Sequence, residues 1–208
     1  MFDEFTQVNA DGTAVSEHGS LRLIIGPMFS GKTSRLIQIL RHNRIAGIPT
    51  CILNHNEDTR YHSAKLSTHD KTMVDCLRTT ALRDVCLRQD VLEQYTCFLV
   101  NEGQFFEDLL ETVSELVCKH GKTVCVAGLD SDFEMQKFGQ ILDLIPICED
   151  VEKLHAICSL CKGRASFTKR LSQETCQKVI GSTNYMPTCR GCHKAARPTG
   201  ANYTSKTI

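Results

Sequence analysis

The chain of 208 residues has no tryptophan, no net charge and no long apolar segment. Its 24 lysines and arginines balance 24 aspartates and glutamates. No apolar run reaches the roughly 18 residues of a membrane-spanning helix. The first residues, MFDEFTQVNADGT, contain no apolar core of a secretory signal. We therefore expect a cytoplasmic, globular protein without a membrane partner.

The neutral total conceals an uneven distribution of charge. Residues 162–208 carry nine lysines and arginines but only one acid, Glu174. A basic segment of this kind can face phosphate or nucleic acid. It can also offset the negative charge that several thiolates leave around one bound metal ion. We favour the second interpretation for part of this charge.

The twelve cysteines would suggest a disulfide framework in a secreted chain. In a cytoplasmic protein, cysteines are instead reduced, buried or bound to metal. Six of them lie in or near apolar segments and are expected in the core: Cys51, Cys86, Cys97, Cys118, Cys125 and Cys148.

Apolar segments alternate with helical patterns along the first three quarters of the chain. The pattern predicts strands at residues 21–25, 50–53, 95–100, 123–129 and 151–156. It predicts helices at residues 32–46 and 105–120, each followed by a glycine. The polar segment 54–75 is expected to be a functional loop. This alternation indicates an α/β fold whose parallel sheet is covered on both faces.

The most specific motif is the octapeptide Gly26-Pro27-Met28-Phe29-Ser30-Gly31-Lys32-Thr33, between the first predicted strand and the first predicted helix. It fits the phosphate-binding P-loop pattern in its strand–loop–helix context. The glycines let successive backbone N–H groups point at phosphate oxygens, and the helix start adds its positive dipole end. Lys32 can reach the β- and γ-phosphates, and the Thr33 hydroxyl can bind Mg²⁺. The motif therefore predicts a site for ATP and Mg²⁺.

A second motif, Asn101-Glu102-Gly103-Gln104, follows the predicted strand at 95–100. The carboxyl ends of parallel strands face the ligand crevice, and P-loop enzymes place acids there, opposite the lysine. Glu102 sits where a carboxylate can accept a proton from an attacking hydroxyl. The simpler alternative is a polar strand end that only aids solubility. With the P-loop present, we favour the catalytic interpretation.

The C-terminal part holds two CxxC pairs, Cys158 with Cys161 and Cys189 with Cys192, separated by 27 residues. Two such pairs supply four thiolates within tetrahedral reach of one Zn²⁺, whereas a redox CxxC would not explain two copies. Four protein ligands leave no open position, so the metal would be structural. His155 and His193 lie close by in the sequence and are expected beside the site rather than as ligands.

The order of these and several smaller motifs resembles the type II thymidine kinase family of cytosolic, zinc-containing enzymes. The resemblance runs from about residue 20 to about residue 195. Its motifs are GPMFSGKT at 26–33, DTRY at 58–61, THD at 68–70, NEGQFF at 101–106, FTKRL at 167–171, VIG at 179–181 and the paired CxxC. The family phosphorylates the 5′-hydroxyl of thymidine or deoxyuridine with ATP and Mg²⁺. The resemblance thus implies a homotetrameric enzyme of pyrimidine salvage that has no nucleic-acid partner.

The resemblance also implies a role for each matching position. Residues 26–33 would hold the ATP phosphates, with Asn101, Glu102 and Gln104 beside the Mg²⁺. Glu102 matches the general base, and Arg60 matches an arginine near the transferring phosphate, where a guanidinium suits the charge of the transition state. The positions that match contacts to the nucleoside are Met28, Phe105, Leu129, Phe133, Phe138, Thr168, Val179, Ile180, Gly181 and Tyr185.

In the family, the loop between the two CxxC pairs closes over the base as a lasso, with zinc fixing its ends. The implied fold is a P-loop NTPase-like parallel sheet flanked by helices, followed by a small zinc-binding domain that carries this loop. We expect a flexible tail at 1–19, the ATP-binding domain at 20–155, the zinc-binding domain at 156–196 and a second tail at 197–208.

One position departs from the family pattern. The family has Asp before the catalytic Glu, where it helps to hold the water shell of the Mg²⁺, and this chain has Asn101. Asn still accepts a hydrogen bond but carries no charge. The departure favours one alternative, a catalytically weak nucleotide-binding domain for regulation or assembly. The basic C-terminal segment favours another, a zinc-ribbon ATPase acting on nucleic acid, which the absence of a nucleic-acid-binding signature opposes.

Overall fold

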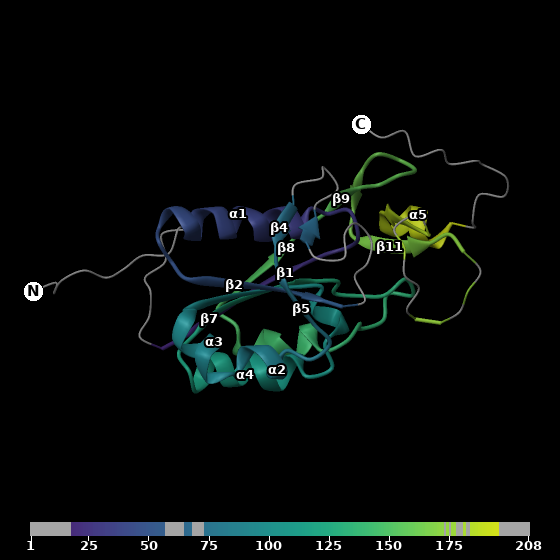
Figure 1. Cartoon of the computed structure of the whole chain (residues 1–208). Coiled ribbons are helices and arrows are strands. Elements are labelled where there is room, and N and C mark those ends of the chain that lie inside the picture. The colour runs from purple at the N-terminus through teal and green to yellow at the C-terminus, as the bar shows by residue number, and fades with distance from the viewer. Residues whose placement is uncertain are drawn as a thin grey trace, which may run out of the picture.

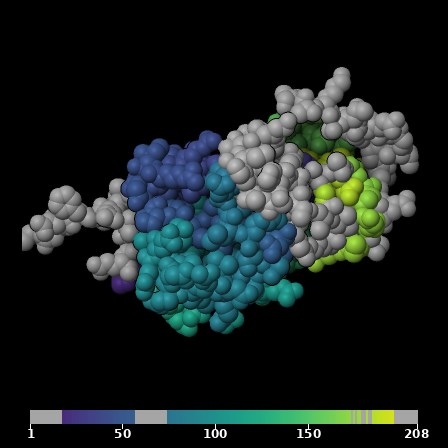
Figure 2. All heavy atoms as spheres, in the orientation of Figure 1, coloured from purple at the N-terminus to yellow at the C-terminus, as the bar shows by residue number. Residues whose placement is uncertain are grey.

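A computed structural model describes residues 18–56, 65–67, 73–172, 174, 176–177, 181 and 184–195 of the chain. Two regions are distinguished below: the sheet region, residues 18–155, and the cysteine module, residues 156–195. Figure 2 shows the sheet region as one packed body, with the cysteine module in green and yellow at one end of it. None of the described helices has both the length and the apolar character needed to span a membrane.

Six parallel strands form the central sheet in the order β5-β2-β6-β7-β1-β8. The strands are β1 (Ser20–Ile25), β2 (Thr50–His55), β5 (Leu77–Thr79), β6 (Cys97–Asn101), β7 (Thr123–Gly128) and β8 (Asp150–Lys153). In the register, Leu23 lies opposite Val126 on one side and Val151 on the other. Because all six strands run the same way, the segments that follow them meet at one edge of the sheet, called here the carboxyl edge.

Helices cover both faces of the sheet (Figure 1). The helix α1 (Lys32–Ile45) lies on one face, and α2 (Arg83–Cys86), α3 (Gln89–Gln94), α4 (Leu109–Cys118) and the 3₁₀ segment η2 (Ile141–Ile147) lie on the other. Side chains alternate between the faces along each strand. Leu23, Phe98 and Val124 pack in the cluster with α4. Their neighbours Ile24, Leu99 and Cys125 pack in the cluster with α1.

The predicted α/β class with a parallel sheet is confirmed, and so are the strands near 21–25, 50–53, 95–100 and 123–129 and the helix at 32–46. The strand expected at 151–156 ends at Lys153. The helix expected at 105–120 is wrong at its start, since α4 begins at Leu109 after the short 3₁₀ segment η1 (Gly103–Phe105). Phe106 has an extended backbone, with φ −84° and ψ 119°, although its side chain is buried. Because Phe106 is apolar and lies three residues before Leu109, the sequence pattern placed it in the helix, although it precedes α4.

The expected core cysteines are confirmed at Cys51, Cys86, Cys97 and Cys125, which are buried. The expectation is wrong for Cys118, which is exposed, whereas Cys148 is half-buried and packs against the core. Cys118 is the last residue of α4, beyond the stripe that packs on the sheet through Leu109, Val113 and Leu116.

The segment expected to be a loop at 54–75 contains more regular structure than its composition indicated. The strand β2 continues to His55, and the short strands β3 (Lys65–Ser67) and β4 (Met73–Asp75) pair in antiparallel register. The motifs at 58–61 and 68–70 lie outside the described residues.

The cysteine module consists of short elements. Strands β9 (Ala156–Ile157) and β10 (Arg164–Ala165) form one antiparallel pair, and β11 (Phe167–Arg170) and β12 (Tyr185–Thr188) form another. The helix α5 (Arg190–Lys194) follows β12. The β11–β12 pair lies within residues 162–188, the loop that the family resemblance implies to close over a nucleoside, and it brings together the two ends of residues 171–184, called here the lasso segment.

Candidate phosphate, nucleoside and metal sites

The P-loop, residues 26–33, connects β1 to α1 at the carboxyl edge. Gly26 has φ +148°, and a Cβ there would lie 2.5 Å from the carbonyl oxygen of Leu154. Gly31 has φ +87° and immediately precedes α1. Residues with a side chain rarely adopt these backbone angles, so both glycines are needed for the turn. The loop thus places the N-terminus of a 14-residue helix at the carboxyl edge of the sheet.

The two polar motifs predicted from the sequence meet at this edge. Lys32 is buried and its Nζ donates to the carbonyl oxygen of Pro27 at 2.7 Å, so the ammonium lies over the loop. Ser30 Oγ donates to the same carbonyl at 2.9 Å. Thr33 Oγ1 donates to Asn101 Oδ1 at 3.3 Å, which joins the start of α1 to the end of β6.

Asn101 has a second partner that sequence reasoning missed. Its Nδ2 donates to Asn54 Oδ1 at 3.0 Å, and both residues are buried. Asn54 lies on the neighbouring strand β2, opposite Asn101 in the register. The sequence offered one indication of this role, since Asn54 is a polar residue near the end of the apolar strand β2. The Asn101 amide uses both of its functions, as acceptor toward Thr33 and as donor toward Asn54.

Glu102 follows β6 in a left-handed conformation, with φ 54° and ψ 43°. Its carboxylate is largely buried and accepts a hydrogen bond from Gln104 Nε2 at 2.6 Å. Gln104 Oε1 in turn accepts from the backbone N–H of Leu129 at 2.9 Å. A Cβ on Gly128 would lie 2.4 Å from that same oxygen, so glycine is required for this approach. Gln104 therefore fixes the carboxylate relative to the end of β7.

The residues predicted to surround a nucleoside are partly brought together. Met28 N donates to Thr168 Oγ1 at 2.9 Å, which joins the P-loop to β11. The rings of Phe105 and Phe138 pack edge to face, with centroids 5.7 Å apart. Phe133 and Tyr185 both contact the side chain of Arg170. Gly181 has φ +130°, whereas Val179 and Ile180 lie outside the described residues. Arg60, predicted near the transferring phosphate, lies outside them too.

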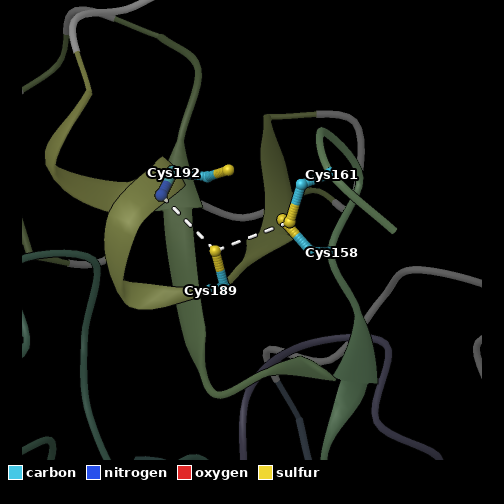
Figure 3. A group of neighbouring side chains, drawn as sticks. All are labelled: Cys158, Cys161, Cys189 and Cys192. Carbon is cyan, nitrogen blue, oxygen red and sulfur yellow. Dashed lines mark hydrogen bonds between the residues drawn. The ribbon is translucent and has the colours of Figure 1, made fainter. Parts of the chain in front are cut away.

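The four predicted metal ligands converge, although 27 residues separate the two pairs. All four Sγ atoms lie within 4.8 Å of one another, and those of Cys161 and Cys189 are 3.7 Å apart. Figure 3 shows Cys158 and Cys161 on one side, facing Cys189 and Cys192 at the start of α5. Tetrahedral ligation with Zn–S bonds of about 2.3 Å places sulfur atoms about 3.8 Å apart. The four residues fit such a metal.

The environment of two of these thiols favours the thiolate. Burial raises the pKa of Cys158, but hydrogen bonds from backbone groups at Cys161, Cys189 and Leu160 outweigh it and bring that pKa down to about 6. Hydrogen bonds from the backbone and the thiol of Cys192 lower the pKa of Cys189. Thiolate is the form that binds metal.

The two nearby histidines have other partners, as expected. His155 Nδ1 hydrogen-bonds to Ser166 Oγ at 3.2 Å, and its Nε2 contacts Arg164. His193 Nδ1 hydrogen-bonds to Thr188 Oγ1 at 3.2 Å. Among the described residues, the metal-binding cluster comprises the four cysteines alone.

Comparison with known proteins accounts for this combination of sites. Residues 19–193 match the family described as thymidine kinase. The chain belongs to the thymidine kinase family. The match spans the sheet region and the cysteine module, and it includes every site position predicted from the sequence, from Gly26 to Cys192.

Similar proteins come from cells and from viruses. The chain is 39% identical to the cytosolic thymidine kinase of Gallus gallus over 188 residues, which cover 90% of this chain and 82% of the relative. It is 44% identical to the thymidine kinase of Vaccinia virus strain Western Reserve over 179 residues, which cover 84% of this chain and 97% of the relative. The thymidine kinase family is a family of nucleoside kinases, so the chain is an enzyme of that class. The regulatory-domain and nucleic-acid alternatives are not favoured.

Proposed function

We propose that this thymidine kinase family member transfers the γ-phosphate of ATP to the 5′-hydroxyl of thymidine or deoxyuridine. The observation that carries the proposal is the meeting of three segments at the carboxyl edge. The P-loop contacts the end of β6 through Thr33 and Asn101. It also contacts the cysteine module through Met28 and Thr168. Phosphate chemistry and nucleoside recognition therefore share one crevice.

In this mechanism, residues 26–33 bind the phosphates of ATP through backbone N–H groups and the start of α1. Lys32 exchanges the neutral Pro27 carbonyl for a phosphate oxygen, because a charged acceptor forms the stronger hydrogen bond. Mg²⁺, when bound, neutralises charge on the transferring phosphoryl group. The Thr33 hydroxyl and the Asn101 carbonyl oxygen, 3.3 Å apart, would hold the ion or its waters, with Glu102 and Gln104 beside them.

Glu102 acts as the general base that accepts the proton of the 5′-hydroxyl. Its short contact with Gln104 supports this role because it fixes the carboxylate without neutralising it. Arg60 is assigned to the transferring phosphate on the strength of the DTRY motif alone. A guanidinium there would stabilise the charge that develops in transfer.

The nucleoside would bind between the sheet region and the cysteine module. Met28, Phe105, Leu129, Phe133, Phe138, Thr168 and Tyr185 are assigned to its contacts, together with Val179, Ile180 and Gly181 of the loop. The four cysteines would hold one structural Zn²⁺ at the base of that loop. We assign the protein to the cytoplasm and expect a homotetramer, which sedimentation analysis would test.

The direct test is an assay of the purified protein with ATP, Mg²⁺ and each nucleoside in turn. We expect a monophosphate from thymidine and deoxyuridine, and no dependence on nucleic acid. Detection by chromatography with labelled ATP separates transfer to nucleoside from ATP hydrolysis. ATP hydrolysis that DNA or RNA stimulates, without nucleoside phosphorylation, would overturn the proposal.

A further inference from the structure

Arg170 is the largest fully buried side chain in the described part of the molecule. It is the last residue of β11 and is 2% exposed. A buried cation is costly unless its surroundings compensate the charge. All of its hydrogen bonds in the described structure end on neutral oxygens, and its Nε has no hydrogen-bond partner there. The groups that contact Arg170 therefore indicate its role.

Three of the compensating acceptors are backbone carbonyls of one short segment. The two terminal nitrogens of the guanidinium donate to the carbonyls of Glu174 at 3.1 Å, Cys176 at 2.5 Å and Gln177 at 2.8 Å. A single side chain thus turns three carbonyl groups of the lasso segment inward. The negative ends of their dipoles partly offset its charge.

The remaining contacts of Arg170 are with two residues assigned to the nucleoside. Its guanidinium carbon lies 3.7 Å from the centroid of the Phe133 ring, a stacking distance. Arg170 also donates to the hydroxyl of Tyr185 at 2.8 Å. One cation therefore contacts the lasso segment, the strand β12 and the loop that follows β7.

A second contact joins the same two segments. Gln177 Nε2 donates to Asp132 Oδ2 at 2.7 Å, and Asp132 Oδ1 accepts from the backbone N–H groups of Glu134 and Gln136 at 2.9 Å each. The lasso segment at 174–177 is thus connected to residues 132–136 at a point other than Arg170. Both contacts join the segment to the loop that contains Phe133.

We infer that Arg170 is a positioning residue that holds the lasso segment, Phe133 and Tyr185 in the arrangement that receives the nucleoside. This inference rests on the proposed function. Arg170 acts through these groups and does not take part in phosphoryl transfer. Lysine could not replace it, because an ammonium cannot stack on Phe133 and donate to several acceptors in one plane.

The test compares Arg170→Lys and Arg170→Gln with a matched control, Arg190→Lys. Arg190 also stacks on an aromatic ring of the module, with its guanidinium carbon 4.6 Å from the centroid of Phe167, but it is exposed. KM for thymidine, KM for ATP, kcat and bound zinc are measured for each variant. Amide hydrogen exchange is followed at residues 174–177 and in β1 as the control for folding.

For both Arg170 variants, we expect the KM for thymidine to rise at least about tenfold while the KM for ATP stays within about twofold. Amides at 174–177 should exchange faster, while β1 and the zinc content stay unchanged. The Arg190 control should match the unmodified protein. Normal thymidine KM in Arg170→Lys, a proportional rise in both KM values, or faster exchange in β1 would each overturn the inference.

Hydrogen exchange separates failure of this inference from failure of the proposed function. If the unmodified enzyme does not phosphorylate thymidine, the proposed function fails, and the exchange comparison still tests whether Arg170 holds the segment. Unchanged exchange at 174–177 in both variants would overturn the positioning role, whatever the substrate.

Discussion

The sheet region and the cysteine module are held together by different interactions. Two apolar clusters, of twenty and nine buried residues, pack on the faces of the sheet. Among the described residues of the module, the corresponding cluster contains three, Ala156, Cys158 and Ala165. A core this small does not offset the conformational entropy lost by ordering some forty residues. A bound metal and buried polar contacts would therefore add stability that this small core does not supply.

The cysteines of the two regions show the same contrast. In the sheet region, burial raises the pKa of Cys51 and of Cys97 to about 12, which keeps these thiols protonated and inert. In the module, hydrogen bonds outweigh burial at Cys158 and lower its pKa to about 6, while the hydrogen bond with Cys189 raises the pKa of Cys192 to about 12. The same residue type thus serves as an apolar core residue in one region and as a candidate metal ligand in the other.

A buried lysine shows how the module is held together. Lys169 Nζ donates to the carbonyls of Cys192, His193 and Ala195 at 3.3, 3.0 and 2.6 Å, at the C-terminal end of α5. Its charge also lies close to the cysteine cluster and would offset part of the negative charge of bound thiolates. Lys169 therefore has a structural role at the end of α5, and the expected offset of thiolate charge by basic residues stays a prediction.

Among the changes considered, metal removal is expected to separate the stability of the module from that of the sheet region most strongly. Structural zinc in small domains contributes about 10–16 kcal/mol of binding free energy. After treatment with a strong chelator, the module should unfold and thymidine binding should be lost, while the sheet region keeps its structure and binds ATP. Elemental analysis, circular dichroism and separate titrations with ATP and thymidine measure these effects.

Two outcomes would contradict this division between the regions. Carefully purified protein without zinc would refute the metal site. Equal loss of ATP and thymidine affinity would show that the metal supports the whole fold. The variant Cys86→Ser provides a control, because it removes a buried sheet-region thiol and should leave the zinc content unchanged.

Glu102→Gln is expected to have the next largest effect, confined to the chemistry of the sheet region. The substitution keeps the shape and the contact with Gln104 but removes the proton acceptor, so kcat should fall by about 10²–10⁴-fold. Thymidine and ATP should bind with near-normal affinity. The exposed Glu111→Gln serves as the control and should keep full activity. Loss of binding in Glu102→Gln would mean that the carboxylate is structural.

Lys32→Ala should lower kcat by on the order of 10²-fold, because it removes a preorganised cation from the transferring phosphoryl group. The zinc content and the affinity for thymidine should not change, since Lys32 is assigned neither to the metal nor to the nucleoside. The exposed Lys119→Ala is the matched control. Near-normal turnover in Lys32→Ala, measured at saturating ATP, would argue against the P-loop assignment.

The sequence predicted the sheet region better than the module for a physical reason. Residues 21–25 and 32–46 have apolar patterns that identify a strand and a helix. The strands of the module are two to four residues long and the sheet-edge strand β5 has three, too few for a periodic pattern. The predicted start of the second helix was also wrong. At η1, Gly103 packs closely on Val126, and the chain turns before α4 begins.

Site residues were likewise predicted only where a pattern in the sequence itself indicated them. The four cysteines were predicted to converge because ligand chemistry requires it, whatever the intervening fold. Arg170 was not predicted, because the motif FTKRL resembles a solvated charged segment and nothing in it indicates burial. Asn54 was missed because its role depends on the pairing of β2 with β6, a contact between residues 47 positions apart.

Asn101→Asp is expected to have the smallest effect, a shift of a few-fold in the Mg²⁺ concentration that supports half-maximal activity. The substitution places a negative charge beside Thr33, where the metal or its waters would lie, so less Mg²⁺ should be required. The contact with Asn54 can be kept, because the Asn54 amide can rotate and donate its N–H to the new carboxylate. The measurement is a Mg²⁺ titration of thymidine phosphorylation at fixed ATP, with Asn101→Leu as the variant that removes both hydrogen bonds. An unchanged titration in Asn101→Asp, together with lost activity in Asn101→Leu, would show that the amide serves the metal site as well as a carboxylate does.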